Sequence, residues 1–376
     1  MSAIREPDRP SRMPDVVSAD LPVDVLAQAV KTASRVIGRP TSFPVTAGVL
    51  LDFGGDELRV TGTNLEVAIE VTVDTKRPSA EGSVVVPAKR FNAVLDKLPL
   101  GDVHLEVEGS DLKVEAGGAS VLLHTIAGAE WPHLDRVDEG EVDLNDELWG
   151  HLVRAALAAS SDPARPVLSG VWFADGWMFA SDAYRASMCQ LPDDSLSGLI
   201  PVQALRDTAR LGDSAKLAIG DLTATFTVGR TKVTAVLLHD NFPDVMGIVR
   251  RAQAETTGRL VVDAAALSDA VALAMTVSDS PVTLEVRDGE VVVSNVANDV
   301  GEVSDSVPAE VEGLLLPCRA SFNPRNLTEA IATVCPAGGK FTLQLAQAEN
   351  GTVDKAALSE GAGVDHLIMP IGSEKS

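Results

Sequence analysis

The sequence predicts an α+β protein made of three repeated domains, each with two helices packed on antiparallel sheet. Two kinds of landmark recur along the chain, as internal repeats do. A proline stands between a strand pattern and an amphipathic helix pattern at Pro87, Pro201 and Pro317, with spacings of 114 and 116 residues. A Pro-Val pair opens an apolar strand pattern at Pro44, Pro166 and Pro281, with spacings of 122 and 115 residues. We therefore expect domains of roughly 115 residues.

The first repeat shows the expected elements. Residues 21–37 have apolar side chains at helical spacing, which predicts an amphipathic helix. Its expected buried face consists of Val25, Leu26, Ala29, Val30, Ala33 and Val36. Residues 56–63 and 111–117 alternate apolar and polar side chains, as half-buried strands do. Hairpin turns are expected at Gly54-Gly55, Asp175-Gly176 and Asp288-Gly289. Each repeat is expected to run strand, helix, three strands, and then the same again.

The composition indicates a globular protein with substantial cores. The chain has 376 residues, of which 45% are hydrophobic, enough for two or three domains. We expect a flexible tail at 1–14, domains at 15–138, 139–256 and 257–371, and a short tail at 372–376. The sequence contains no run of about 18 uncharged apolar residues, and its first residues lack the apolar core of a signal peptide. A cytoplasmic protein without membrane partners is expected.

No pattern indicates an enzyme, a metal site or a cofactor. The cysteines are far apart and odd in number, which suits buried thiols better than disulfides or a zinc knuckle; they are Cys189, Cys318 and Cys335. The segment "CPAGGKF" lacks the spacing of a phosphate-binding loop. His151 with Asp146, and Ser160 with Ser161, have no third group beside them. A hydrolase using the His151 region is the weakest function considered.

Basic residues recur on the polar faces of the expected helices. They are Lys31, Arg35, Arg39, Arg90, Lys97, Arg154, Arg206 and Arg210. A solvated helix face would explain any single pair. The recurrence in a chain with a formal net charge of −23 favours a stripe that follows nucleic-acid phosphates without reading bases. Acidic groups on a distant surface hardly oppose this, because salt screens charges beyond about 8 Å at physiological ionic strength.

Four sequence blocks together resemble the bacterial β sliding clamp, the processivity subunit of DNA polymerase III. They are "RPTSFPVTAGVLL" with "LRVTGTNLEVAIEV", "GSVVVPAKRFNAVLDKLP", "NFPDV" and the closing "HLIMPI". The resemblance runs from about residue 15 to residue 371. It implies a non-enzymatic protein of the DNA clamp type, which forms a ring around duplex DNA as a head-to-tail homodimer. The basic residues above would then face DNA, and an edge near residues 103–116 would pair with the third repeat of a second copy.

The resemblance also implies protein partners. These are the DNA polymerase III α subunit, the clamp loader, repair polymerases and other clamp-motif proteins, which would bind by short peptides in an apolar pocket. Residue by residue, the pocket would consist of Leu168, Ser181, Ala183, Tyr184, Arg185, Ala186, Pro243, Gly247, Ile248, Asn323, Leu367, Ile368, Met369, Pro370 and Ile371. Ordinary packing between domains is the alternative role for these residues.

The sequence departs from the family pattern at several positions. The family usually has Arg where Gly247 stands and a basic residue where Gly372 stands, and Ala186 replaces a bulkier residue. The first helix pattern of the third repeat has no Lys or Arg, and residues 257–376 contain 7 basic against 17 acidic residues. The sequence therefore leaves two functions open: a processivity clamp, or a divergent accessory paralogue that acts as a peptide-binding adaptor and encircles DNA weakly or not at all.

Overall fold

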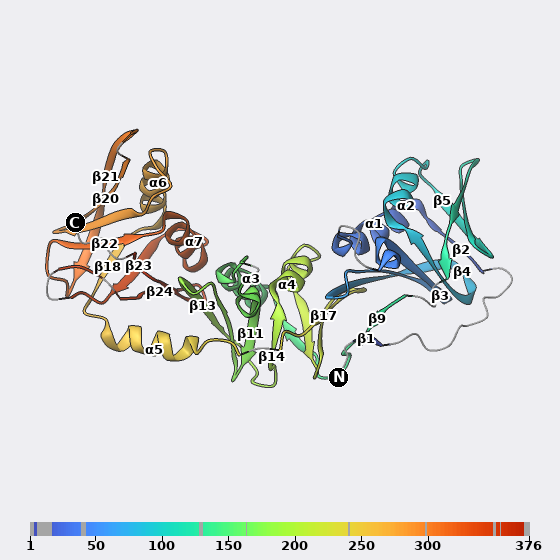
Figure 1. Ribbon diagram of the computed structural model, residues 1–376, viewed down its shortest axis with the longest axis horizontal. Helices are drawn as coiled ribbons and strands as arrows, with labels where there is room; N and C mark the ends of the chain where they lie inside the picture. Colours follow the sequence, from blue (N-terminus) through green and yellow to red (C-terminus); the bar gives the residue numbers. More distant parts are fainter. Residues whose placement is uncertain are drawn as a thin grey trace. The chain divides into compact units, whose positions relative to one another are not determined.

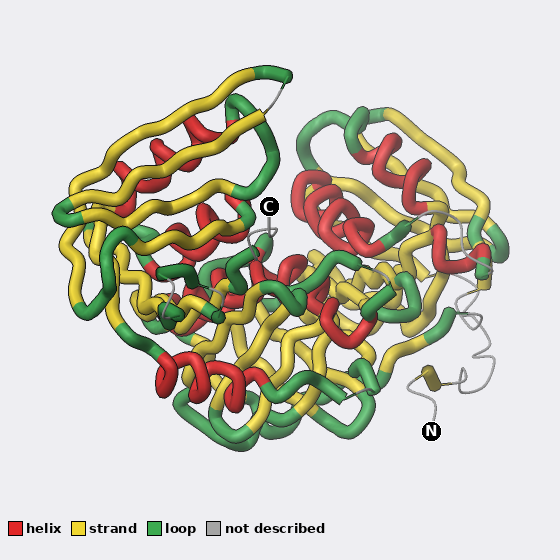
Figure 2. Tube along the Cα trace, turned by 60° about the vertical axis from the view of Figure 1, so that its left-hand side comes forward, coloured by secondary structure: helices red, strands yellow, loops and turns green. Residues whose placement is uncertain are grey.

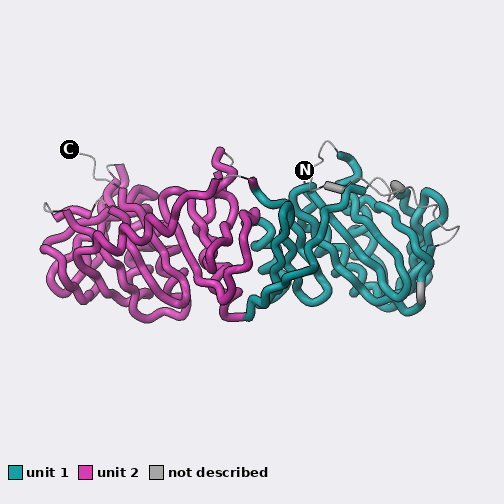
Figure 3. The backbone as a smooth tube through the Cα atoms, turned by 90° about the horizontal axis from the view of Figure 1, so that it is seen from below, with its two compact units in different colours: residues 1–145, 203–238 teal, residues 146–202, 239–376 magenta. Residues whose placement is uncertain are grey.

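The computed structural model describes residues 4–5, 17–38, 43–127, 131–162, 164–239, 241–297, 299–348, 351–353 and 355–371. The chain divides into two compact units (Figure 3). Unit 1 contains residues 1–145 and 203–238, and unit 2 contains residues 146–202 and 239–376. Each unit therefore includes part of the second expected domain, residues 139–256, whose boundaries stay a prediction.

Unit 1 combines antiparallel sheets with helices (Figure 1). Its strands are β1 (Ile4–Arg5), β2 (Val17–Pro22), β3 (Gly48–Thr63), β4 (Val67–Pro87), β5 (Asp102–Glu108), β6 (Asp111–Ala116), β7 (Ala119–His124), β8 (Ile126–Ala127), β9 (His133–Leu134), β10 (Val142–Leu144), β15 (Ala215–Ile219), β16 (Thr223–Val228) and β17 (Thr231–Val236). Among the described residues, one sheet has the order β2-β5-β6-β7, and another has the order β10-β15-β16-β17-β4-β3 with β8 on β4. Strand β1, inside the predicted tail, pairs with β9.

The helices of unit 1 bury one face each. They are α1 (Val23–Ala33), η1 (Ser34–Val36), η2 (Pro44–Ala47), α2 (Ala88–Leu95) and α4 (Val202–Ala209), the last beginning at the boundary of the unit. Leu26, Ala29 and Val30 of α1 are buried as predicted, but Val25 is 39% exposed. Because α1 begins at Val23, the buried stripe starts there instead.

Two expectations for unit 1 are wrong. Gly54 and Gly55 lie inside β3, where the pairing with β4 shifts register, so they form a bulge and not a hairpin turn. Residues 103–116 are not a sheet edge, because β5 lies between β2 and β6, and β6 lies between β5 and β7. The edge strand next to them is β7, whose Leu122 side chain is 61% exposed.

Unit 2 is built on one long antiparallel sheet. Its strands are β11 (Gly170–Ala174), β12 (Trp177–Ser181), β13 (Arg185–Gln190), β14 (Gly198–Pro201), β18 (Gly258–Asp263), β19 (Val282–Arg287), β20 (Glu290–Ala297), β21 (Gly301–Glu312), β22 (Cys318–Phe322), β23 (Lys340–Leu345), β24 (Ala357–Gly361) and β25 (Val364–Ile368). Their order among the described residues is β14-β11-β12-β13-β25-β24-β23-β18-β21-β20-β19-β22. Figure 2 shows helices, in red, lying against strands, in yellow.

Helices cover both faces of this sheet. They are α3 (Asp146–Ala155), η4 (Ala156–Ala158), η5 (Pro166–Ser169), α5 (Val245–Glu255), α6 (Ala264–Met275) and α7 (Pro324–Val334). Side chains from α6 and α7 pack on one face, with Ala357 and Ile368 of the sheet. Helix α5 packs on the other face, with Leu358 and Leu367 (Figure 1). Successive side chains along β24 and β25 point to opposite faces of the sheet and so pack in two separate apolar clusters.

The order of elements agrees with the repeat pattern for the second and third repeats. Both run strand, helix, three strands, strand, helix, three strands. The first repeat differs because β4 continues for 21 residues through two expected strands. The Asp175-Gly176 turn forms as predicted, with both residues at positive φ. Pro317 does not precede a helix, because it leads into β22, and Asn323 occupies the N-cap position that Pro87 occupies for α2.

Candidate functional site

Strand pairing brings two predicted pocket segments together in unit 2. Strands β13 and β25 pair so that Arg185 lies opposite Ile368 and Ala186 lies opposite Leu367. Beyond the paired strands, the Met369 N–H donates to the Tyr184 carbonyl at 2.7 Å. The segment from Ser181 to Ala186 and the closing apolar run are therefore neighbours.

The turn between β12 and β13 has a strained conformation. Ala183 has a φ of 76°, which is unusual for a residue other than glycine. The Ser181 hydroxyl accepts from the Ala183 N–H at 3.1 Å and donates to the Arg185 carbonyl at 2.8 Å. Asp182 Oδ1 accepts from the N–H groups of Tyr184 and Arg185. These bonds hold the turn in place, and the Tyr184 side chain is left 63% exposed.

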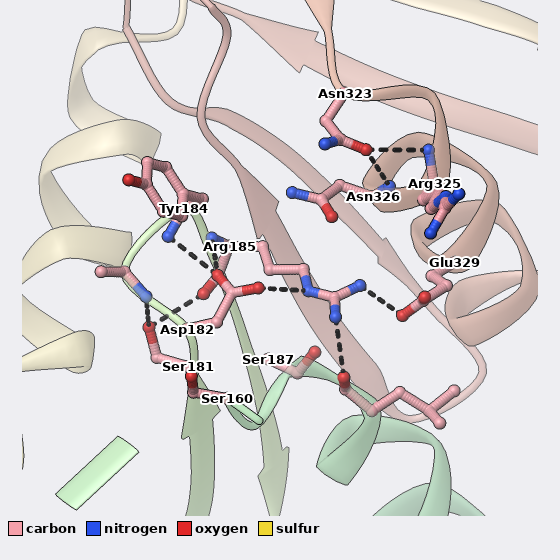
Figure 4. Close-up of polar contacts among 12 residues, drawn as sticks. Ser160, Ser181, Asp182, Tyr184, Arg185, Ser187, Asn323, Arg325, Asn326 and Glu329 are labelled. Carbon is pink, nitrogen blue, oxygen red and sulfur yellow. Dashed lines mark hydrogen bonds and ion pairs between the residues drawn. The ribbon is translucent and has the colours of Figure 1, made fainter. Parts of the chain in front are cut away.

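The Arg185 guanidinium is engaged by groups from three elements (Figure 4). Its Nε donates to Asp182 Oδ2 at 3.0 Å, its Nη2 donates to the Leu157 carbonyl at 3.1 Å, and its Nη1 pairs with Glu329 of α7. The side chain is only 11% exposed. Arg185 therefore holds the turn against η4 and α7, a structural role that the sequence did not reveal.

Helix α5 completes the apolar part of the site. Ala186 and Leu367 belong to a buried cluster with Val245 and Val249 of α5, and Ile248 packs against it. Pro243 is exposed just before the helix, and Leu168 is buried in η5. Ile368 corrects the prediction, because it is fully buried in the cluster on the opposite face of the sheet and cannot line the same pocket.

The start of α5 depends on Gly247. Asp244 caps the helix by accepting the Gly247 N–H at 2.8 Å. A Cβ at Gly247 would lie 2.1 Å from Asp244 Oδ2, so any side chain there would disturb this cap. Sequence reasoning missed α5, although Asp244 followed by apolar residues at 245, 249 and 252 is an N-cap and a helical stripe.

The end of the described chain reaches the third repeat. Met369 and Ile371 are 37% and 40% exposed, and Pro370 is partly buried. The Ile371 N–H donates to the Ser321 carbonyl at 2.7 Å, which places it close to the start of α7. There Asn323 Oδ1 accepts from two N–H groups of the first helical turn, so this side chain is an N-cap. Gly372 lies outside the described residues.

A buried histidine lies beneath the site. The His366 ring is fully buried, and its Nδ1 is 2.6 Å from the Ser187 hydroxyl on the paired strand. Its Nε2 has no hydrogen-bond partner among the described residues. Burial lowers the pKa of His366 to about 3, and the positive charge of Arg185 acts in the same direction. The ring is therefore neutral at physiological pH.

Cations of the first repeat differ according to the element that carries them. Those on strands are paired with carboxylates, for example Arg59 with Asp52 at 2.6 Å and Lys113 with Glu115 at 3.1 Å. Those on the helices and the turn after α2 are exposed and form no ion pair with the described residues. They are Lys31, Arg35, Lys89, Arg90 and Lys97. Lys89 was missed by the sequence analysis.

A groove in unit 1 brings two predicted basic residues together. It has a volume of about 460 Å³, and Arg35 and Arg210 both line it. Asp24 and Gln28 of α1 line it as well. Arg210 is 61% exposed and pairs with the buried Asp207 at 2.9 Å. Arg206 is partly buried and has no ion pair among the described residues. Arg39 lies outside the described residues.

Arg154 departs from the prediction that it faces DNA. Its Nε donates to the Thr333 carbonyl at 3.1 Å, and its Nη2 donates to the Ala362 carbonyl at 3.0 Å. Burial lowers the pKa of this guanidinium from its usual range. Arg154 therefore connects α3 to the end of α7 and to the turn before β25.

The cations of the third repeat are all paired. Every Lys and Arg that the structure describes between residues 257 and 371 forms an ion pair with Asp or Glu. The pairs are Arg259 with Glu312, Arg287 with Glu285 and Glu290, Arg319 with Glu285, Arg325 with Asp279, Lys340 with Glu310 and Lys355 with Glu255. This repeat therefore offers no uncompensated positive charge in its described part.

Comparison with known proteins finds similarity to β sliding clamps. Residues 21–135 match the family model described as DNA polymerase III beta subunit, N-terminal domain. The beta sliding clamp of Streptomyces coelicolor is 28% identical over 378 residues, covering 93% of this chain and 97% of that protein. The chain is thus similar to β sliding clamps over most of its length. A second relative of the clamp, the homolog GriR of Streptomyces muensis, is 25% identical and covers the same shares of both chains.

Solved clamp structures share the fold. The beta sliding clamp of C. crescentus has a TM-score of 0.86 at 21% identity, covering 96% of this chain and 100% of that chain. The sliding clamp of Bacillus subtilis has a TM-score of 0.85 at 20% identity, covering 95% and 99%. At these identities the likeness shows the fold alone. It confirms the α+β clamp fold expected from the sequence.

The clamp family is non-enzymatic, in agreement with the sequence analysis. In the described part of the clamp, no group of three or more His, Cys, Asp or Glu side chains could hold a metal ion. His151 lies against Gly363, since a Cβ on that glycine would meet the imidazole at 2.3 Å. Burial raises the pKa of the Cys189 thiol to about 12, so it stays protonated. None of the helices among the described residues is long and apolar enough to span a bilayer.

Proposed function

We propose that this clamp is a DNA polymerase processivity factor that encircles duplex DNA as a head-to-tail homodimeric ring. It would bind DNA without sequence preference, because phosphate contacts position a protein but do not read bases. The observation that carries this proposal is the set of exposed cations on α1, η1 and α2 that form no ion pair with the described residues, in a chain with a net charge of −23. Closure around DNA makes modest local attraction sufficient, so an acidic exterior is compatible with sliding.

The exposed edge of β7 supports the dimer. Strand β7 is the outer strand of its sheet in unit 1, and it carries the exposed Leu122. An unpaired edge of this kind is a hazard unless another strand covers it. We infer that the third repeat of a second copy pairs with this edge, where the sequence analysis had placed residues 103–116.

The apolar site of unit 2 supports tethering of protein partners. Tyr184, Met369 and Ile371 expose apolar surface beside a turn that Arg185 holds in place. Such a surface fits short peptides of the DNA polymerase III α subunit, the clamp loader and repair polymerases. The replacements Met369→Ala and Pro243→Ala are each expected to weaken binding of a polymerase tail peptide and to leave the dimer intact. Unchanged peptide affinity would contradict this role.

The encircling ring is tested by a topological experiment. The clamp is loaded on nicked circular DNA with an ATP-driven loader, and the circle is then linearised. A ring that encloses the duplex slides off the free ends, whereas a protein held by contacts alone stays on both forms. Equal retention on circular and linear DNA, or failure to load, would count against the proposed function.

A peptide-binding adaptor that does not encircle DNA is the second candidate. It is favoured by the third repeat, where each described Lys and Arg is compensated by a carboxylate. The adaptor would bind partner peptides through the site of unit 2 but would show no difference between circular and linear DNA. The same topological experiment therefore separates the two candidates.

A further inference from the structure

Helices α1 and α2 of unit 1 are held together by hydrogen bonds and by a shared apolar core. Asn92 of α2 donates to the Ser34 hydroxyl of η1 at 2.9 Å and to the Ala88 carbonyl at 2.9 Å. Ser34 in turn donates to the Val30 carbonyl of α1 at 2.6 Å. Leu26 of α1 and Phe91 of α2 are fully buried in one apolar core. The backbone positions from which the exposed side chains of the two helices extend are therefore held in place.

The cations of this helix pair gather on its exposed faces. On α1 and η1, Lys31 and Arg35 are four residues apart, which places them on one side of the helix. On α2, Lys89 and Arg90 precede the buried Phe91, and Lys97 lies in the turn that follows the helix. All of these side chains are exposed and have no ion pair among the described residues. We call this set, Lys31, Arg35, Lys89, Arg90 and Lys97, the α1–α2 cation face.

The corresponding helices of the third repeat present no such face. Along α6 the exposed residues of the described chain include Ala265, Asp269 and Ala272, and the single charge among these three is negative. On α7, Arg325 pairs with Asp279 at 3.4 Å. Glu329 pairs with Arg185. The helix pair α6–α7 thus carries no net positive charge to attract phosphates.

We propose that each protomer contacts the DNA backbone through the α1–α2 cation face, and that the third repeat passes the duplex without phosphate contacts. This inference rests on the proposed function and adds where the contacts lie, with Lys89 as a further contact residue. Each phosphate contact releases counterions, so it contributes about 0.9 to the slope of log K against log salt. Cations already neutralised by carboxylates contribute no such release.

The test compares two triple variants with equal changes in charge. The first, Lys31→Gln with Arg35→Gln and Arg90→Gln, removes three members of the cation face. The matched control, Arg259→Gln with Arg325→Gln and Lys340→Gln, removes three paired cations of the third repeat. Binding of a fluorescent duplex to the full chain is followed by anisotropy between low and high salt, and circular dichroism checks that both variants are folded.

The first variant is expected to lose about 10²- to 10³-fold in affinity near 0.1 M salt, and its slope is expected to fall by about 2.7 per protomer. The control is expected to change affinity by less than about two-fold, because exposed ion pairs contribute little. Equal losses in both variants, or no loss in the first, would overturn the inference. Retention of the unmodified clamp on linearised DNA in the topological experiment would instead count against the proposed function itself.

Discussion

Lys31, Arg154 and Ala272 each lie eight residues after the start of a helix, α1, α3 and α6 respectively, and they differ in what they do. Lys31 is exposed and has no ion pair among the described residues. Arg154 donates to two backbone carbonyls. Ala272 is exposed and has no charge. The same helical position therefore carries an exposed cation in α1, a hydrogen-bonded guanidinium in α3 and an uncharged side chain in α6.

The comparison shows why counting basic residues by repeat is not sufficient. Arg154 and Lys31 have the same sign and the same position, yet a guanidinium with several donors can be held by nearby carbonyls. Carbonyls of Thr333 and Ala362 are within reach in unit 2. The number of free cations, and not the number of cations, sets the attraction for phosphates.

The largest expected effect is on stability, from Arg154→Gln. The change removes two charge-assisted hydrogen bonds that connect α3 to α7 and to the turn before β25. We expect the free energy of unfolding to fall by about 1.5–3 kcal/mol. The salt slope of DNA binding should be the same as in the unmodified clamp. Urea denaturation and duplex anisotropy measure the two quantities.

Lys31→Gln is the matched control for Arg154→Gln. It removes one charge at the same helical position but breaks no ion pair with a described residue. It should leave the free energy of unfolding within about 0.5 kcal/mol of its original value. If Arg154→Gln lowers DNA affinity as much as Lys31→Gln does and leaves stability unchanged, the contrast between the two positions is wrong.

The next expected effect is a loss of folding stability at low pH, caused by the buried His366. Burial lowers the pKa of His366 to about 3, whereas the unfolded chain titrates its histidines near 6.5. Between these values the unfolded state binds a proton that the folded state does not. Stability is therefore complete above about pH 6.5 and falls as the pH is lowered, by up to about 1.4 kcal/mol per pH unit.

His366→Gln tests this dependence. The amide side chain keeps a polar group opposite Ser187 but does not titrate. Between pH 6.5 and 4, urea denaturation should show a shallower loss of stability for the variant, with a difference of about one proton. An identical pH slope in both proteins would mean that His366 is protonated in the folded state, contrary to its buried position.

The smallest expected effect is the gain in DNA affinity when a cation is added to α6, which has no Lys or Arg. Ala272→Lys places an ammonium group at the position that Lys31 occupies on α1. If the exposed face of α6 lies near the duplex without touching it, one new contact should raise affinity by up to about eight-fold near 0.1 M salt. Ala265→Lys, on an earlier turn of α6, is the comparison variant. Equal gains from both variants would indicate general attraction and no defined contact.

Sequence reasoning found the fold class because apolar spacing and turn residues repeat with the domains. It misplaced one landmark, since Pro317 matches Pro201 in spacing but Asn323 caps α7 in its place. It missed α5, although Asp244 and the stripe from Val245 to Ala252 mark a helix.

The candidate site could be predicted only in part. The resemblance implied that Ala186, Leu367 and Ile368 line one pocket, but the side of the sheet on which Ile368 lies depends on strand register. The partners of Arg185 and Arg154 are far away in sequence: Glu329 is 144 residues from Arg185, and Thr333 is 179 residues from Arg154. Neither helical spacing nor charge counts could reveal such contacts.

Photo-crosslinking from single positions tests the central claim most directly. Benzoylphenylalanine is introduced in place of Lys31 in one protein and in place of Ala272 in another, and each is loaded on a nicked circular duplex and irradiated. We predict that the first protein forms a covalent adduct with DNA and that the second forms little or none. Adducts of equal yield from both positions, or an adduct from Ala272 alone, would contradict contact through the α1–α2 cation face.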